Sequence, residues 1–563
     1  MEILNSRRIT GPSLFTEFPG AMLEVQVPNT IQDEAIQAWD VSVRRYLNVV
    51  GWGQSTTLTR KYENGISLYF NAPIDALYAA CEINEAAWEL ALWELNSEGA
   101  ISFPEEVNRL KKEIEDELNP NILALKEASI RNKVRFFQSD DIVSVGTGKG
   151  SHSFDVNKIP DPEEIDWKEV SDIPVILITG TNGKSTIVRL METLLAEAGF
   201  SPGASSTDGL RVNLETVEVG DYSGPEGARA TLRTKGISSA VLEVARGGIL
   251  RRGMPVENVQ AAIITNVAED HFGEWGVASL PDMIATKFVV RKVLAKNGLL
   301  VVNADDAGCV KFAESLSETL CWFSLESNNP VIKQHCDAGG RSCYVEGDQI
   351  IFSSASNKEI IAEVKDFPIT VSGMARYNIQ NCLGAILLAK ALDINTVEIK
   401  KGLSSFGGSF NENPGRGNFF EKDGITIVFD FAHNPHGLNA IVDLVSQFEA
   451  KRKLVLIGQA GDRSDNDIFS LVKAAANLNP DKVVACEILK FLRGRETEEV
   501  PELIKSYFIE QGIEENSIII KEDILSGVNS ALEWAESGDL LLLLALDQKE
   551  ECIEAIQTFC ADR

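Results

Sequence analysis

The sequence predicts an α/β protein of several domains whose centre is a phosphate-binding loop between a strand and a helix. Residues 175–190 read VILITGTNGKSTIVRL, in which an apolar β-branched run meets two glycines and then a helical pattern. Strand-like and helix-like segments alternate from residue 170 to residue 410, and a second alternating series runs from residue 425 to residue 546. Such alternation is typical of parallel sheets that are covered by helices.

Length and charge limit the classes of protein to consider. A chain of 563 residues exceeds what one hydrophobic core supports, so about three or four domains are expected. Apolar residues make up 44% and charged residues 24%, as in ordinary globular proteins. The formal net charge of −30 argues against nucleic acid or an anionic membrane as a partner, because a polyanion would be repelled.

Cysteine use and the first residues indicate a cytoplasmic protein. The nine cysteines are scattered and contain no C-x-x-C, which is typical of reduced thiols. MEILNSRRITGPSLF carries charge where a signal peptide needs an apolar core, and no apolar run reaches about 18 residues. We therefore expect neither secretion nor a membrane span.

Residues 1–135 lack a nucleotide-binding pattern and predict an α+β accessory domain. Strands are expected at 22–27 and 67–70, and helices at 74–95 and 104–118. The Pro-rich, acidic stretch IPDPEEIDW at 159–167 is typical of a linker. The predicted domains are therefore 1–165, 166–410 and 411–563.

Two basic, glycine-containing stretches in this region each have more than one interpretation. Arg7, Arg8, Gly11 and Pro12 form a compact turn that either binds a carboxylate or, as we favour, is purely structural. The stretch GTGKG at 146–150 looks like a second phosphate loop, but SHSF follows it in place of a helix. Without the positive end of a helix dipole, we expect a loop or a hairpin there.

The stretch TGTNGKS at 179–185 carries the chemistry of an anion site. Gly180 and Gly183 let backbone N–H groups turn toward a phosphate, and the following helix and Lys184 add positive charge. Ser185 is placed to offer its hydroxyl to a Mg²⁺ ion that bridges phosphate oxygens. The general G-x-x-x-x-G-K-[ST] pattern is only partly met, since Ile178 stands where its first glycine would be.

Polar side chains follow two further strands of the central region. Glu243 ends one, and Asn266, Asp270 and His271 follow another. The carboxyl ends of parallel strands meet at one sheet edge, so these groups are expected beside the phosphate loop, where Mg²⁺ chemistry needs oxygen ligands. The expected strands are 175–179, 240–244, 261–267 and 299–303, with helices from the loop to 198 and at 280–295.

The C-terminal series predicts a separate α/β domain. Its first strand ends in DFAHNPH, so Asp430, His433 and His436 leave the sheet together. Further upstream, Asn378 and Asn381 are spaced to face one side of a helix, although capping also explains Asn378. The expected strands of the domain are 425–431, 453–457, 482–486, 517–520 and 540–546.

Taken in order, these motifs resemble the signature of the Mur ligase superfamily. The sequence is most similar to the Mur-like half of the cyanophycin synthetases, over residues 170–563. The motifs that carry the resemblance are TGTNGKS at 179–185, Glu243, N-x-x-x-D-H at 266–271, Y-N-x-x-N at 377–381, PGRG at 414–417 and DFAHNP at 430–435, with TDG at 207–209 and ARGGILR at 245–251.

The N-terminal part also resembles the first domain of cyanophycin synthetases, through R-x-x-GP at 8–12 and VGTGKGSHSF at 145–154. Those enzymes have an ATP-grasp domain between the two parts, where this chain has only about 20 residues. We therefore expect no ATP-grasp domain. Tyr377 stands where many relatives have His.

The resemblance implies a Mur-ligase-like central P-loop ATPase domain, a C-terminal Rossmann-like domain, and ATP and Mg²⁺ as cofactors. Lys184 would contact the ATP phosphates, Ser185 and Glu243 a first Mg²⁺, and His271 a second. Lys287 matches a position that relatives often carbamylate, although a solvated helical lysine is the alternative. Backbone groups of the loop would hold the phosphates, from Gly180, Thr181, Asn182, Gly183, Lys184, Ser185 and Thr186.

From the C-terminal side the resemblance implies that Asn378 lies near adenine, Arg416 reaches a phosphate and Asp430 contacts the ribose. The implied reaction turns an acceptor carboxylate into an acyl phosphate, from which an amine displaces phosphate. Arginine added to an aspartate side chain of a peptide or polymer is the expected pair. Another amino-acid substrate with a separately encoded partner ligase, a homo-oligomer, and a non-catalytic ATP-binding scaffold remain open.

Overall fold

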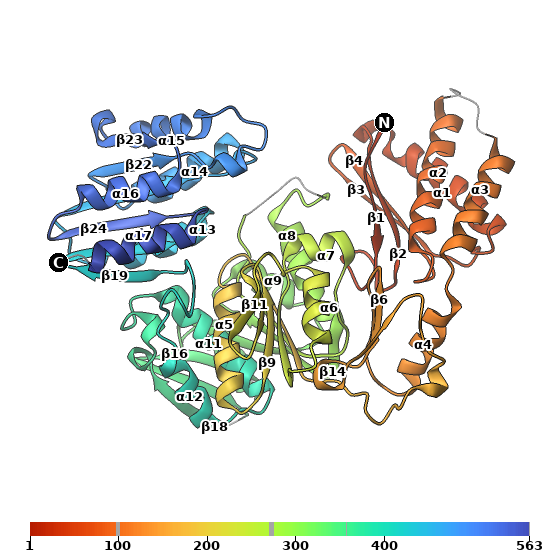
Figure 1. Ribbon diagram of the computed structural model, residues 1–563, viewed down its shortest axis with the longest axis horizontal. Coiled ribbons are helices and arrows are strands. Elements are labelled where there is room, and N and C mark those ends of the chain that lie inside the picture. The colour runs from red at the N-terminus through yellow and green to blue at the C-terminus, as the bar shows by residue number, and fades with distance from the viewer. Residues whose placement is uncertain (97–101, 270–274, 356, 562–563) are drawn as a thin grey trace. The chain divides into compact units, whose positions relative to one another are not determined.

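The computed structural model describes residues 1–96, 102–269, 275–355 and 357–561 (Figure 1). Its contacts divide the chain into two compact units. The predicted domain boundaries at 165/166 and 410/411 stay predictions. Among the described residues, no helix combines the length and the apolarity needed to cross a membrane. The first unit comprises Met1–Tyr344, Ile351–Glu359 and Leu383–Ile399, and the second comprises Val345–Ile350, Ile360–Cys382 and Lys400–Arg563.

The first unit begins with an antiparallel sheet of strand order β1-β2-β4-β3, packed against helices, as an α+β domain requires. Inside its core the indole N–H of Trp39 donates to Asn84 at 2.9 Å. Asn84 in turn donates to the carbonyl oxygens of Ala21 and Leu68, so this buried polar side chain is paired. The elements are β1 (Glu2–Ile9), β2 (Gly20–Gln26), α1 (Gln32–Val49), β3 (Thr57–Tyr62), β4 (Gly65–Asn71), α2 (Leu77–Asn96) and α3 (Phe103–Glu117).

The expected basic turn at residues 7–12 is wrong for its first half. Arg7 and Arg8 lie in β1, because this segment pairs with β2. The guanidinium of Arg7 is buried, forms a salt bridge of 2.7 Å with Glu24, and donates to the carbonyl oxygen of Leu250 at 3.0 Å. A buried charge is tolerated only when it is paired and hydrogen-bonded in this way.

The second glycine-rich stretch is a hairpin, as expected. Strands β6 (Ile142–Val145) and β7 (His152–Asp155) pair antiparallel, and Gly148–Gly150 forms a single 3₁₀ turn between them. The N–H of Lys149 donates to the carbonyl oxygen of Ile237 at 2.9 Å, which docks the turn on the central region. A third strand, β5 (Phe136–Gln138), and helix α4 (Pro120–Arg131) complete this small subdomain.

The central sheet has the strand order β11-β10-β9-β12-β8-β13-β14-β15-β16-β17-β18. Strand β8 (Val175–Thr179) pairs parallel with β12 and with β13, and all its residues are buried. A continuous apolar strand of this kind is expected where helices cover both faces of a sheet. The other elements are α5 (Lys184–Glu197), β9 (Pro202–Ser206), β10 (Gly209–Val212), β11 (Glu215–Glu218), α6 (Pro225–Arg233), β12 (Ser239–Glu243), α7 (Arg246–Arg252), β13 (Val259–Ile264), α8 (Leu280–Lys287), β14 (Leu294–Asn303), α9 (Ala307–Ala313), β15 (Thr319–Ser324), α10 (Pro330–Asp337), β16 (Arg341–Glu346), β17 (Gln349–Ser354) and β18 (Asn357–Glu363).

The helix expected at 280–295 is shorter than its apolar pattern suggested. Helix α8 ends at Lys287, a 3₁₀ segment covers Phe288–Val293, and β14 begins at Leu294. The run rich in valine after Lys287 is buried, and Leu294 pairs with Val259 in the sheet. Pairing with β13 therefore overrides the local helical pattern, as tertiary context often does.

The second unit contains a sheet of order β19-β20-β24-β21-β22-β23, parallel except for β19 (Figure 1). Leu540 and Leu542 of β24 pack against α13–α15, while Leu541 and Leu543 pack on the opposite side with α16 and α17. This alternation builds a core on each face. The elements are β19 (Asn418–Lys422), β20 (Ile425–Asp430), α13 (Pro435–Val445), β21 (Arg452–Gly458), α14 (Asp465–Ala476), β22 (Lys482–Cys486), α15 (Glu499–Glu510), β23 (Ile518–Lys521), α16 (Ile524–Trp534), β24 (Asp539–Leu544) and α17 (Lys549–Ala561). Helices α11 (Arg376–Ala391) and α12 (Thr396–Ser405) precede them in the chain, and the residues of each are divided between the two units.

Candidate functional site

The phosphate-type loop connects β8 to α5 and depends on its two glycines. Gly180 has φ +147°, and a Cβ added there would lie 1.8 Å from the hydroxyl oxygen of Thr265. Gly183 has φ +84° and is the residue before α5, which begins at Lys184. Only glycine fits the first position, and it is strongly favoured at the second. Residues 180–186 therefore form the strand–loop–helix unit that the sequence predicts.

The end of β13 holds this loop in place. The N–H of Thr181 donates to the carbonyl oxygen of Asn266 at 2.8 Å, and the N–H of Asn182 donates to the Asn266 side chain at 3.0 Å. The Thr265 hydroxyl donates to the carbonyl oxygen of Asn182 at 2.6 Å. Sequence reasoning missed Thr265, although its position beside Asn266 at a strand end was a usable signal.

The side chains that would meet a metal-bound phosphate start from this frame. Lys184 Nζ donates to the carbonyl oxygen of Thr181 at 2.9 Å, so the ammonium curls back over the loop. The Ser185 hydroxyl donates to Glu243 at 2.9 Å and lies 3.2 Å from the Thr207 hydroxyl. Glu243 is 1% exposed at the end of β12. Thr186, in the first turn of α5, is also buried.

This donor set fits Mg²⁺, which is bound in proteins by few carboxylates and otherwise by water and phosphate oxygens. Two hydroxyls and one carboxylate are all hard oxygen donors. Among the described residues, no three His, Cys, Asp or Glu side chains are grouped as a metal site. The predicted ligand of a second Mg²⁺, His271, lies outside the described residues.

Lys287 is placed against the same loop. It is the last residue of α8, is 5% exposed, and its Nζ donates to the carbonyl oxygen of Gly180 at 2.8 Å. The alternative of a solvated helical lysine is therefore wrong. Whether the amine becomes carbamylated stays a prediction.

The remaining predicted residues lie in the second unit. Asn378 is buried, donates to the carbonyl oxygen of Ile369 at 3.0 Å, and accepts from Asn381 at 3.1 Å. The guanidinium of Arg416 lies 5.0 Å from the centre of the Phe431 ring, and Lys549 Nζ lies 4.3 Å from the same centre. Two cations thus contact one aromatic ring, whose π-electrons attract basic side chains.

Asp430 ends β20 in a nearly closed environment. Its two carboxylate oxygens accept from the N–H groups of Gly417 and Ala432, each at 2.6 Å. Burial raises the pKa of Asp430 to about 6, although the Arg416 charge and the N–H donors act in the opposite direction. The carboxylate of Asp430 thus acts as a hydrogen-bond acceptor at the end of β20.

Motif residues beyond the predicted set have structural partners. Asn434 caps α13 by accepting from the N–H of Gly437 at 2.8 Å. Nδ1 of His433 lies 3.1 Å from the carbonyl oxygen of Phe431. Arg493, in the stretch LRGR at 492–495 that also resembles the cyanophycin synthetases, forms an exposed salt bridge of 2.6 Å with Asp462.

Comparison with curated proteins finds long matches of moderate identity. The chain is 32% identical over 387 residues to a cyanophycin synthetase of Synechocystis. The matched region covers 69% of this chain and 44% of that relative. It spans, in other words, less than half the length of that enzyme. It is 23% identical over 384 residues to a UDP-N-acetylmuramoyl-L-alanyl-D-glutamate–2,6-diaminopimelate ligase of Listeria monocytogenes, covering 66% of this chain and 72% of that one.

The fold also matches solved structures. E. coli FolC in complex with DHPP and ADP superposes with a TM-score of 0.50 at 18% identity, over 68% of this chain and 89% of that one. At this identity the match establishes the fold alone. Residues 178–389 match the Mur ligase middle domain, and residues 415–545 match the Mur ligase glutamate ligase domain. The chain belongs to the Mur ligase family.

Proposed function

We propose that this protein is an ATP-dependent amide ligase of the Mur type. The observation that carries the proposal is the joint placement of the loop, Lys184 and the buried Ser185–Glu243 pair at the carboxyl ends of neighbouring parallel strands. A loop built only for structure does not need a buried carboxylate beside its first helical hydroxyl. Family membership and the ADP held in the FolC complex support ATP as the nucleotide.

The residues support a two-step reaction. The N–H groups at the start of α5 and Lys184 would bind the β- and γ-phosphates, because those of Thr181 and Asn182 already donate to Asn266. Ser185 and Glu243 would hold Mg²⁺, which neutralises phosphate charge when bound. An oxygen of the acceptor carboxylate attacks the γ-phosphorus, and ADP leaves. The amine nitrogen then attacks the acyl carbon, loses a proton, and expels inorganic phosphate to leave an amide.

The finer assignment rests on the motif resemblance and is also a proposal. Arginine joined to an aspartate side chain of a peptide or polymer is the pair we favour. The Listeria relative is named for a different amino acid, so a ligase for another amino acid is the second candidate. A cytoplasmic location accompanies either reaction, since ATP and amino acids are both available there.

The experiment incubates the full chain with Mg-ATP and pairs of amino acids and acidic peptides, and records phosphate release and product mass. Phosphate release that requires both a carboxylate and an amine supports the ligase, and the mass identifies the pair. ATP binding without any condensed product would instead favour a non-catalytic scaffold.

Lys184→Ala gives the matched test of the loop. We expect turnover to fall below detection, because the variant removes the one full positive charge within the loop. Lys296→Ala, an exposed lysine of β14, is the control and should keep full turnover. Normal turnover of Lys184→Ala would show that the loop does not bind the reacting phosphate.

A further inference from the structure

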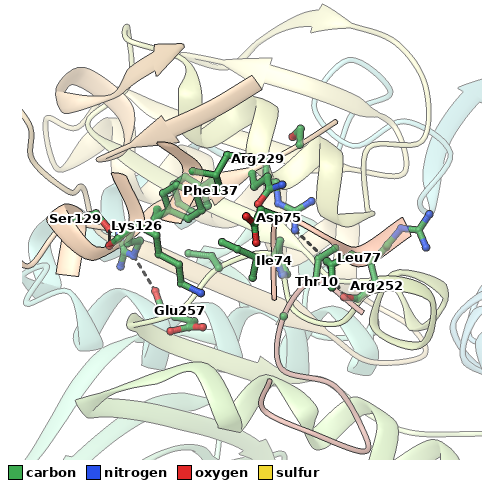
Figure 2. Close-up of a pocket in the computed structure, with 18 of the residues that line it drawn as sticks. Thr10, Ile74, Asp75, Leu77, Lys126, Ser129, Phe137, Arg229, Arg252 and Glu257 are labelled. Carbon is green, nitrogen blue, oxygen red and sulfur yellow. Dashed lines mark hydrogen bonds between the residues drawn. The ribbon is translucent and has the colours of Figure 1, made fainter. Parts of the chain in front are cut away.

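A cavity of about 850 Å³ lies within the first unit, away from the phosphate loop (Figure 2). Several segments that are distant in sequence line it, among them the end of β1 with the residues after it, Asp75 with its neighbours before α2, the segment from α4 to β5, and the end of α7 with the residues after it. None of the residues assigned to the ligase site lines it. Its volume is in the range of small-molecule sites, which are about 300–1,000 Å³.

The wall of the cavity carries charges of both signs in equal number. Six basic and six acidic side chains line it. Several are already paired: Arg8 with Asp140 at 2.8 Å, and Arg229 with Glu226 and with the hydroxyl of Thr10. A wall of this composition favours a ligand that itself carries both charges over a purely apolar one.

Asp75 is the acidic group in this wall whose hydrogen bonding is incomplete. The residue is 2% exposed, and Figure 2 shows it between Lys126 and Ser129 on one side and Thr10 and Leu77 on the other, with Arg252 beyond these two. One of its carboxylate oxygens accepts a long bond of 3.3 Å from the N–H of Asn119, and the other is buried without a hydrogen-bond partner. Buried oxygens are nearly always paired, so this one lacks a donor that a ligand can supply.

Arg252 provides the complementary group. It ends α7 and donates to the carbonyl oxygens of Arg8 and Arg251, each at 3.3 Å. Among the described side chains no carboxylate forms a salt bridge with it. Burial is the main cause that lowers the pKa of Arg252, and the charges of Arg8 and Arg251 lower it further, while Asp140 acts in the opposite direction. An anion placed there would relieve this repulsion.

We propose that the cavity binds a small zwitterion of the size of an amino acid or short peptide, with its ammonium group on Asp75 and its carboxylate on Arg252. Such a ligand supplies the missing donor and the missing anion at once. Since residues of the N-terminal region and of the central region both line the cavity, a bound ligand would bridge them. The site does not depend on the proposed ligase reaction.

The test is isothermal titration of the full chain, without ATP, with L-arginine, L-aspartate, L-lysine, L-glutamate and glycine. Succinate, inorganic phosphate and 1,4-diaminobutane serve as probes that carry only one kind of charge. At least one amino acid should bind, and each single-charge probe should bind at least tenfold more weakly. Asp75→Asn and Arg252→Met should each weaken amino-acid binding at least tenfold.

The control variants make matched changes in an exposed salt bridge of α1. Asp40→Asn and Arg44→Met alter a pair of 2.9 Å on the helix surface and should leave binding unchanged. Lys184→Ala should also bind as the wild type does, which separates the cavity from the ligase site. A Lys184→Ala protein that loses turnover but keeps amino-acid binding supports both proposals independently.

Three results would overturn the zwitterion site. The first is that none of the amino acids binds, and the second is that Asp75→Asn and Arg252→Met bind as tightly as the wild type. The third is that succinate or phosphate binds as well as an amino acid and only Arg252→Met affects it, which describes an anion site. If Asp75→Asn does not fold, Arg252→Met and the single-charge probes decide the matter.

Discussion

Replacing Gly180 by alanine should disable the phosphate loop while leaving the fold intact. The new Cβ would lie 1.8 Å from the Thr265 hydroxyl and 3.0 Å from its Cβ, and the backbone there has φ +147°. Residues other than glycine rarely adopt that backbone conformation, because it costs about 1–3 kcal/mol. The overlap adds to this cost, because Thr265 or the loop must move by roughly 1 Å, a displacement that can lower a rate about 100-fold.

The assay measures the ADP affinity by isothermal titration in the presence of Mg²⁺, together with turnover once substrates are known. We expect Gly180→Ala to weaken ADP binding at least tenfold and to lower turnover about 100-fold. Gly199→Ala is the matched control, because Gly199 also has positive φ, +81°, but nothing lies within 4 Å of an added Cβ. Gly199→Ala should lower the stability of the protein but leave its ADP affinity unchanged.

A double variant separates the overlap from the backbone strain. Gly180→Ala with Thr265→Ala removes the nearer overlapping atom, so part of the lost affinity should return, even though Thr265→Ala alone loses its bond to Asn182. ADP binding by Gly180→Ala within about threefold of the wild type would refute the reasoning that close approach of the backbone to Thr265 sets the loop.

Two further predictions concern stability. The pKa of Asp430 is raised to about 6 from an ordinary 3.8, so the unfolded chain releases this proton first as the pH rises. The group therefore costs no stability below about pH 4, and it lowers stability by about 3 kcal/mol once the pH has passed through about 6. The melting temperature of Asp430→Asn should therefore rise relative to that of the wild type between pH 4 and pH 7. A difference in melting temperature that does not change with pH would contradict the raised pKa. In the N-terminal core, Asn84→Ala leaves the Trp39 N–H unpaired, removes one donor from each of two carbonyl oxygens, and should cost about 2–4 kcal/mol in denaturant unfolding. The exposed Asn108→Ala of α3 should cost under about 0.5 kcal/mol, and equal effects of the two would show that the buried network contributes nothing.

Elements whose signal is local could be predicted from the sequence. Strands 175–179 and 482–486 were expected at the residues where β8 and β22 occur, because each is a short apolar run between clear turn residues. The placement of Glu243 at a strand end followed from the same kind of pattern. The helix at 280–295 could not be predicted to its end, because its apolar pattern continues through the 3₁₀ segment Phe288–Val293, and only the pairing of Leu294 with Val259 of β13 shows where the strand begins.

Side-chain partners distant in sequence could not be predicted. Arg7 looks like part of an exposed basic turn until β1 pairs with β2 and brings Glu24 beside it. Lys287 looks solvated until the end of α8 meets the carbonyl of Gly180, which lies 107 positions earlier in the chain. Asp75 and Arg252 carry no motif at all, and they line one cavity only because separate segments fold together.

The sequence by itself determined the α/β class, the phosphate loop and the order of the family motifs, because backbone conformation and hydrophobic periodicity are set by neighbouring residues. Only the tertiary structure decided which polar groups are buried and what pairs with them. Burial and pairing depend on contacts between distant segments. These contacts raise the pKa of Asp430 and leave one carboxylate oxygen of Asp75 buried without a hydrogen-bond partner.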